Sequence, residues 1–260
     1  MVLAVQRLPR AHKLHQNARL AGFIDVETTG LSGVHDEVVE FAMVLFAFDP
    51  ETGDILGIVD EYVGLRDPGR PIPPRATAVH GICDADVRGK RLDERRIRAL
   101  IDQAEFLVAH NARFDRAFVE RLFPGARKKQ WHCSMSEIPW KGLGFRSRGL
   151  HNLLADHNIR IERAHRGLDD VLGALALLAS ADSSGSCYFK YIVAQHYKLD
   201  LAGLSTWQTP SAPSDQSASD VSVVAQRQGG HDPKSRQRFS ERTARLFGTL
   251  FGRWRSKEPN

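Results

Sequence analysis

The sequence has few cysteines and no long apolar segment. Its three cysteines are Cys83, Cys133 and Cys187. Their number is odd and their spacing fits no zinc motif, so they suit a reducing cytosol better than a disulfide-bonded secreted fold. No stretch reaches the ~18 apolar residues that a membrane-spanning helix needs. The basic N-terminus is followed by no apolar segment, so a secretory signal is not expected. These absences exclude a membrane-embedded protein and predict a cytoplasmic one.

Signatures of several common enzyme classes are also missing. The sequence contains no Gly-rich Walker loop, no zinc signature and no Ser-His-Asp arrangement. What it does contain is an ordinary globular composition, with 42% hydrophobic and 26% charged residues in a chain of 260. This composition excludes wholesale disorder and collagen-like repeats. The length allows one domain of about 150–200 residues with appendages.

Charge is unevenly distributed along the chain. The net charge is +5, yet residues 20–205 carry 23 basic and 26 acidic side chains. Residues 1–19 carry four basic side chains and no acidic one, and residues 206–260 carry nine basic and five acidic ones. An acidic body with basic ends differs from a protein coated with positive charge for binding polyanions. If the body handles nucleic acid, we expect an acidic site there that requires cations.

Composition divides the chain into four parts. Residues 1–19 are a basic lead-in, and residues 20–205 form the globular body with a trailing helix. Residues 206–235 are rich in Ser, Asp, Gln, Pro and Gly, which predicts a disordered, flexible linker. In residues 236–260, Phe, Leu and Trp recur at helical spacing among arginines. This last pattern predicts a basic amphipathic C-terminal helix.

Hydrophobic patterning of the body predicts an α/β fold. Short apolar runs closed by Gly or Pro indicate strands, and longer periodic segments indicate helices. Strands in the first part and strand–helix alternation afterwards predict a mixed central sheet flanked by helices. The expected strands are 20–27, 38–48, 55–63 and 106–109, and the expected helices are 75–80, 92–103, 114–123, 150–156 and 169–179.

Two carboxylates stand at the end of the first expected strand. Side chains at positions i and i+2 share one face of a strand, so Asp25 and Glu27 lie roughly 7 Å apart along it. The strand is otherwise apolar, and buried carboxylates normally need a partner or a metal. The turn Thr28-Thr29-Gly30 adds hydroxyls and backbone amides. Taken alone, such a pair is common and a solvated strand end would explain it better.

Two further polar groups occur where a helix begins. Asn111 and Asp115 follow the fourth expected strand, and a helix cap with a favourable dipole contact would also explain them. Asp170 falls in the first turn of the last helix of the body, with Asp169 as its predicted N-cap. A five-residue offset within one helix would turn two side chains apart, so His165 is expected on the preceding loop.

In this order, the motifs resemble the DEDDh family of 3′–5′ exonucleases, whose fold is ribonuclease H-like. The first motif is similar to Asp25-x-Glu27 with the following Thr-Thr-Gly-Leu, the second to Asn111-x-x-Phe114-Asp115, and the third to His165 with Asp170. A further segment, Ala78-Val79-His80-Gly81-Ile82, is similar to one found in the proofreading subunit of bacterial DNA polymerase III and its relatives. The resemblance covers roughly residues 20–180. One departure is Arg75, because close relatives often carry an acidic residue at this position.

The resemblance implies a metal-dependent exonuclease that hydrolyses phosphodiester bonds at single-stranded DNA 3′ ends and releases nucleoside monophosphates. Two divalent ions, Mg²⁺ or Mn²⁺, would act on the attacking and leaving oxygens. The implied metal ligands are Asp25, Glu27, Asp115 and Asp170, with Asp115 acting directly or through water. His165 would be the general base, so activity should rise with pH through the histidine range. The implied substrate contacts are Thr28, Thr29, Gly30, His80, Asn111 and Phe114.

Several alternatives remain open at this level. The motifs do not report the 2′-hydroxyl, so an RNA-trimming member of the family is the nearest alternative to a DNA exonuclease. A non-catalytic binding module with a nuclease fold is a third reading, although such a module would not need all five acidic and histidine side chains. The C-terminal helix is expected to dock on a polymerase or another replication or repair protein. It would otherwise attract nucleic acid, lie at a membrane interface or pack on its own domain; membrane association is not expected.

Overall fold

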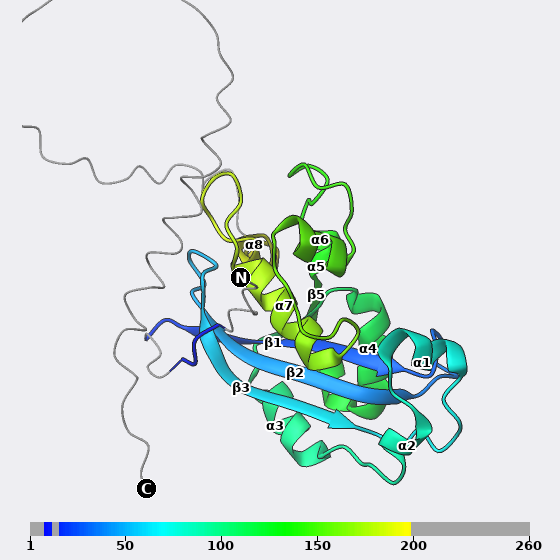
Figure 1. Cartoon of the computed structure of the whole chain (residues 1–260). Helices are drawn as coiled ribbons and strands as arrows, with labels where there is room; N and C mark the ends of the chain where they lie inside the picture. The colour runs from blue at the N-terminus through cyan, green and yellow to red at the C-terminus, as the bar shows by residue number, and fades with distance from the viewer. Residues whose placement is uncertain (1–7, 12–15, 199–260) are drawn as a thin grey trace, which may run out of the picture. The chain divides into compact units, whose positions relative to one another are not determined.

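A five-stranded mixed sheet forms the centre of the protein (Figure 1). The computed structural model describes residues 8–11 and 16–198. Along the sheet the strands follow the order β3-β2-β1-β4-β5. Strand β1 pairs antiparallel with β2 and parallel with β4, and β5 is parallel to β4. The predicted mixed sheet is confirmed, with strands β1 (Arg19–Thr28), β2 (Val38–Phe48), β3 (Ile55–Leu65), β4 (Phe106–Ala109) and β5 (Gln130–Cys133).

The helices lie close to their expected positions. The predicted bounds of the helix at 150–156 are confirmed, and the other expected helices differ from the structure by one or two residues at one or both ends. Short elements near residues 84–87 and 124–137 have too few residues to give a periodic signal. The helices are α1 (Pro74–His80), α2 (Asp84–Val87), α3 (Glu94–Gln103), α4 (Ala112–Leu122), α5 (Ser134–Glu137), α6 (Leu150–Asp156), α7 (Gly167–Ala179) and α8 (Phe189–Tyr197), with a 3₁₀ turn at Pro124–Lys128.

The alternation of side chains along β1 assigns its residues to two separate cores. Ala21 and Phe23 belong to the cluster that includes α7 and α8, whereas Ile24 and Val26 pack with residues of α3 and α4. Because side chains alternate along a strand, Asp25 and Glu27 continue the row of Ala21 and Phe23. Both carboxylates therefore stand on the face of the sheet that α7 covers (Figure 1).

A glycine allows α7 to begin directly against β2. A Cβ atom at Gly167 would lie 2.9 Å from the Cβ of Ala42 and 3.6 Å from Oδ2 of Asp25. Any larger residue at this position would push the start of α7 away from the sheet. The small residue thus sets how closely Asp170, one turn further along α7, approaches β1.

The predicted role of Asp169 as a helix cap is wrong. Helix α7 begins at Gly167, with Arg166 in the N-cap position. Asp169 lies inside the first turn and pairs with Arg163 at 3.0 Å. The sequence pattern placed the start two residues late because glycine is a weak helix former. In the structure Gly167 lies in the first turn, where its lack of a side chain permits the close contact with β2.

Parts of the predicted organisation lie outside the described residues. The linker at 206–235 and the C-terminal amphipathic helix at 236–260 fall there, as do most residues of the basic lead-in. Within the part of the chain that the structure describes, no helix is long and apolar enough to cross a membrane.

Candidate functional site

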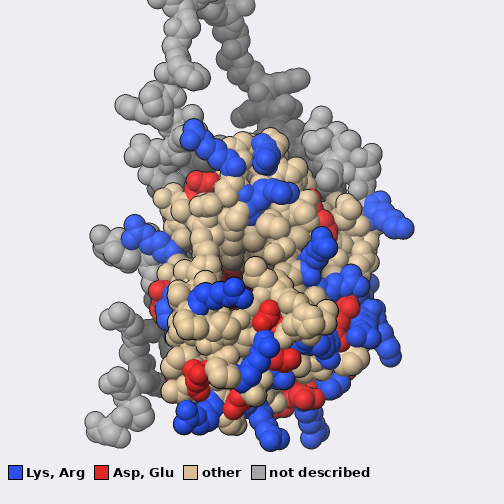
Figure 2. Space-filling model, turned by 90° about the vertical axis from the view of Figure 1, so that its right-hand side faces the viewer, with Lys and Arg blue, Asp and Glu red and all other residues tan. Residues whose placement is uncertain are grey.

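A cavity of about 880 Å³ opens where β1 and β4 end. These two strands are parallel neighbours, so their carboxyl ends meet at one edge of the sheet, the usual place for a ligand in an open α/β sheet. All five residues of the predicted catalytic set line this cavity: Asp25, Glu27, Asp115, His165 and Asp170. Figure 2 shows a face of the molecule on which blue side chains surround a tan surface with a central hollow.

Three of the four predicted metal ligands form one compact group. Carboxylate oxygens of Asp25, Glu27 and Asp170 all lie within 4.8 Å of one another. Asp25 and Glu27 come from consecutive positions on one face of β1, and Asp170 from the first turn of α7. Within the described residues, the buried Oδ1 atom of Asp170 has no hydrogen-bond partner. An oxygen-only donor set with an unpaired buried atom fits a hard divalent cation.

Asp115 reaches the same cavity from the opposite helical layer. It lies in the first turn of α4, is 4% exposed, and its Oδ1 accepts the Val26 N–H at 3.2 Å. This hydrogen bond fixes Asp115 to the backbone of β1 between Asp25 and Glu27. Asp115 is not one of the three residues in the compact group. Its position is consistent with a residue that contacts a metal ion from further away or through a water molecule.

Burial and mutual repulsion raise the pKa values of these carboxyl groups. Burial and then the charge of Glu40 raise the pKa of Asp25 to about 7. Burial, followed by the charges of Asp25 and Asp170, raises the pKa of Glu27 to about 9. The pKa of Asp170 rises to about 8, again mainly through burial and Asp25. Asp115 shifts in the same direction, through burial and then Asp25. A bound cation would relieve this repulsion.

We expect the metal-free protein to lose stability as pH rises. In the folded state Asp25, Glu27 and Asp170 keep their protons to about pH 7, 9 and 8, well above their ordinary pKa values of 3.8 or 4.5. The folded state therefore binds more protons than the unfolded state in this interval. The stabilisation is complete below the ordinary values and is lost as pH passes through the raised ones.

Urea unfolding midpoints in chelator across this pH range measure the effect. Glu27→Gln removes the group with the highest pKa, so the decline with pH should become shallower in this variant. Equal slopes for the wild type and Glu27→Gln would contradict the expected role of Glu27.

His165 lies on the loop before α7, as the spacing predicts. Its backbone is left-handed, with φ 59°, and its N–H donates to Oδ2 of Asp170 at 3.0 Å. This hydrogen bond ties the loop to the side chain of Asp170, five residues further along the chain. The side chain is exposed at the edge of the cavity, where it can approach a bound substrate.

Glu40 is a site residue that the sequence reasoning missed. It lies on β2 directly opposite Glu27 and is only 2% exposed. Its carboxylate accepts hydrogen bonds from Arg166, the shortest at 2.7 Å, and from the Gly167 N–H at 2.7 Å. This pair anchors the loop of His165 to the sheet. An acidic residue within the otherwise apolar run 38–48 was the available signal, because a buried charge requires a partner.

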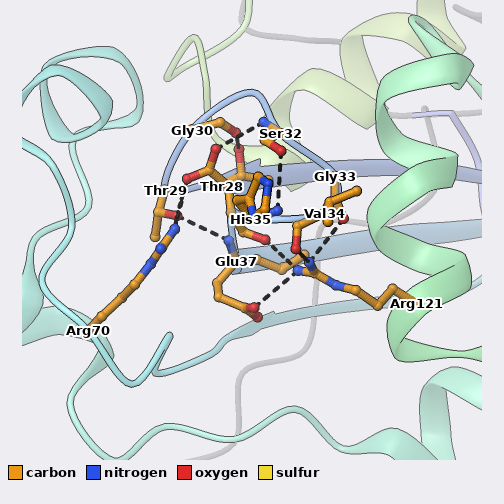
Figure 3. A network of polar contacts seen from close by, with 12 residues as sticks. Thr28, Thr29, Gly30, Ser32, Gly33, Val34, His35, Glu37, Arg70 and Arg121 are labelled. Carbon is orange, nitrogen blue, oxygen red and sulfur yellow. Dashed lines mark hydrogen bonds and ion pairs between the residues drawn. The ribbon is translucent and has the colours of Figure 1, made fainter.

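The loop after β1 is held by a dense polar network (Figure 3). The Thr29 hydroxyl donates to Asp36 at 3.1 Å and accepts from the Glu37 N–H at 3.0 Å and from Arg70 at 2.8 Å. Arg121 of α4 donates to the backbone carbonyls of Gly33 and Val34. Thr29 is fully buried, so it shapes the loop and its hydroxyl is already used within the protein.

Other predicted contact residues lie at the cavity. Thr28, Gly30, His80, Asn111 and Phe114 line it, together with the exposed Arg75. The Thr28 hydroxyl donates to the Gly30 carbonyl at 2.6 Å, so it too serves the turn. Asn111 occupies the N-cap position of α4 but makes no capping hydrogen bond with its side chain.

His80 is held in one tautomer. The Ile82 N–H donates to Nδ1 at 3.0 Å, so a neutral ring carries its proton on Nε2. Burial lowers the pKa of His80, which favours the neutral ring. Within the described residues, the buried Nε2 atom has no hydrogen-bond partner. The ring is thus a fixed hydrogen-bond donor at the wall of the cavity.

A family model and several relatives match the sequence of the chain. The model of the RNase_T family, described as "Exonuclease", matches residues 23–178. The DNA polymerase III subunit epsilon of Treponema pallidum (strain Nichols) is 28% identical over 190 residues, which cover 67% of this chain and 83% of that protein. The PolC-type DNA polymerase III of Streptococcus suis is 39% identical over 97 residues, 36% of this chain and 6% of that much longer protein.

The comparison with solved structures supports the same fold. Escherichia coli exonuclease I in complex with a dA16 oligonucleotide superimposes with a TM-score of 0.54 at 19% identity. The match covers 72% of this chain and 45% of exonuclease I. At this level of identity the likeness shows the architecture, and the chemistry must be argued from the residues in the cavity.

Proposed function

Because the chain belongs to the RNase_T family of DEDD-type 3′–5′ exonucleases, we propose that it removes nucleoside monophosphates one at a time from single-stranded DNA 3′ ends. The observation that carries this proposal is the compact group formed by Asp25, Glu27 and Asp170 near the C-terminal end of β1. DNA is the favoured substrate since the relatives described above are a DNA polymerase III subunit and a PolC-type DNA polymerase III.

The cluster of carboxylates in the cavity would hold two divalent cations, Mg²⁺ or Mn²⁺. Asp25, Glu27 and Asp170 would be direct ligands, and Asp115 would complete the set directly or through water. When bound, such ions stabilise the negative charge that develops on the attacking and leaving oxygens of a phosphodiester. The raised pKa values of the three carboxyl groups support this assignment. They are raised because the buried carboxylates repel one another, and positive charge would relieve that repulsion.

His165 would act as the general base that takes a proton from the attacking water. Three features support this role: its exposure at the cavity, its place beside Asp170 and the hydrogen bond that fixes its backbone. The Glu40–Arg166 pair would limit the motion of the loop, since it ties the next residue to the sheet. Positioned general bases of this kind contribute about 10²–10⁴-fold to rate.

The substrate would be held by groups from both sides of the cavity. The His80 Nε2–H is a fixed donor for a sugar or phosphate oxygen of the terminal nucleotide. Arg75 offers a guanidinium suited to a phosphate, and the half-buried Phe114 ring offers a surface on which a base can stack. Docking of residues 236–260 on a polymerase stays a prediction from the sequence.

A direct assay tests the proposal. The full-length protein is incubated with a 5′-labelled single-stranded DNA oligonucleotide or a matched RNA, each with Mg²⁺, with Mn²⁺ or with chelator. We expect a metal-dependent ladder that shortens from the 3′ end, with DNA degraded faster than RNA. The site variant is Asp25→Asn, which should lose the ladder. Its matched control is Asp102→Asn, which neutralises an exposed carboxylate on α3 away from the cavity and should leave the ladder unchanged.

The possible outcomes separate the alternatives. Faster shortening of the RNA would replace DNA by RNA as the substrate. Intact oligonucleotides under every metal condition would overturn the catalytic proposal and favour a binding module with a nuclease fold.

A further inference from the structure

A second group of potential metal ligands lies beside the carboxylates and combines two histidine side chains with one carboxylate. Ligand atoms of His151, His165 and Asp170 all lie within 4.8 Å of one another. His151 stands in the first turn of α6, and its Nε2 is 3.7 Å from Oδ1 of Asp170. The rings of His151 and His165 meet edge to face, with their centroids 4.5 Å apart.

The donor atoms of this group are available. Oδ2 of Asp170 accepts the His165 N–H, whereas Oδ1 is buried and has no hydrogen-bond partner among residues 8–11 and 16–198. In the same ranges no hydrogen bond engages the ring nitrogens of His151 or His165. Both histidines line the cavity, and the side chain of His151 is 37% exposed, so an ion has a path from solvent.

Close packing and hydrogen bonds support the elements that carry the three residues. Helices α6 and α7 approach closely at Gly173, where an added Cβ would lie 3.1 Å from Cδ1 of Leu154, one turn beyond His151. His165 is fixed through its own N–H and through the neighbouring Arg166–Glu40 pair. The three donors, now within 4.8 Å of one another, would have to move closer together to bind one ion at about 2.0–2.2 Å each.

The donor set distinguishes this group from the neighbouring carboxylates. Mg²⁺ prefers oxygen ligands, whereas two imidazoles and one carboxylate are typical of zinc sites that keep a fourth position open. We propose that His151, His165 and Asp170 form a zinc site that shares Asp170 with the carboxylate group. Occupation of this site would take up the ring of His165 and inhibit the exonuclease; this consequence rests on the proposed function.

Metal binding is tested first without nucleic acid. The full-length protein, in excess Mg²⁺ to saturate the oxygen ligands, is titrated with Co²⁺ as a spectroscopic substitute for zinc and then with Zn²⁺ in competition. We expect tetrahedral Co²⁺ absorption bands that Zn²⁺ displaces. His151→Asn should weaken the affinity for Zn²⁺ by at least about tenfold. The matched control is His35→Asn, which removes an exposed histidine outside the group and should bind as the wild type does.

Wild-type affinity and spectrum in His151→Asn would overturn the proposal, since the ion would then be held elsewhere. Activity gives a separate readout, in which each protein is normalised to its own zinc-free rate at fixed Mg²⁺. Zn²⁺ should inhibit the wild type and His35→Asn, and His151→Asn should need at least about tenfold more Zn²⁺ for equal inhibition.

The two readouts distinguish the two proposals. Zinc binding that depends on His151 in a protein without nuclease activity would support the site and reject the proposed function. Nuclease activity without His151-dependent binding would reject the site alone.

Discussion

Asp25→Asn is expected to lower the rate of 3′-end cleavage by about 1000-fold and, without metal, to raise the melting temperature. Loss of a ligand to catalytic cations removes several kcal/mol of transition-state stabilisation, and about 4 kcal/mol corresponds to this factor. The stability change has the opposite sign because Asp25 is the charge that raises the pKa of Glu27 and Asp170 most. Neutralising it relieves the repulsion inside a poorly solvated group.

Thermal unfolding with and without Mg²⁺ checks both parts of this prediction. Mg²⁺ should stabilise the wild type strongly and Asp25→Asn only weakly, so the order of the two melting temperatures reverses when the ion is added. Asp102→Asn should follow the wild type throughout. If Asp25→Asn melted at a lower temperature than the wild type in chelator, the repulsion derived for this group would be wrong.

His165→Asn should reduce the rate of cleavage by about 10²–10⁴-fold, the range for loss of a general base. Asn is one of the few residues that tolerate a left-handed backbone, so the variant keeps φ near 59° and the N–H bond to Asp170. Fold and Mg²⁺ binding should therefore survive. The measurement is the pH–rate profile beside the Mg²⁺-dependent thermal shift.

A general base and a structural residue give different results in this experiment. If His165 takes the proton, the pH–rate profile of His165→Asn should differ from that of the wild type, whereas the thermal shift produced by Mg²⁺ is kept. If the variant kept the pH dependence and lost the thermal shift, the role of His165 would be to hold the clustered carboxylates in place for the metal ion rather than to transfer a proton.

Local patterns in the sequence were enough to place most elements. The apolar runs 38–48 and 106–109 have the same bounds as β2 and β4, because short buried strands bounded by turn residues are defined by their own composition. The N-terminus of α7 was misplaced by two residues, since its start depends on the fit of Gly167 against Ala42 of β2. That fit cannot be seen in the helix sequence itself.

The predicted catalytic set shows the same division between what local sequence indicates and what packing decides. Asp25, Glu27, Asp115, His165 and Asp170 were identified from motifs in their order along the chain, and the structure brings all five to one cavity. Glu40 and His151 were not identified. Glu40 acts through a residue 126 positions away, and the importance of His151 comes from the packing of α6 on α7.

The sequence by itself singled out the side chains that are proposed to supply the chemistry, because residue types and strand periodicity are local properties. Only the tertiary structure decided how they meet. It placed three carboxylates in one group, fixed Asp115 through the Val26 N–H, and committed the Thr29 hydroxyl to the loop. The physical reason is that strand order and helix packing set distances between segments far apart in the chain, and repulsion, burial and pKa shifts depend on those distances.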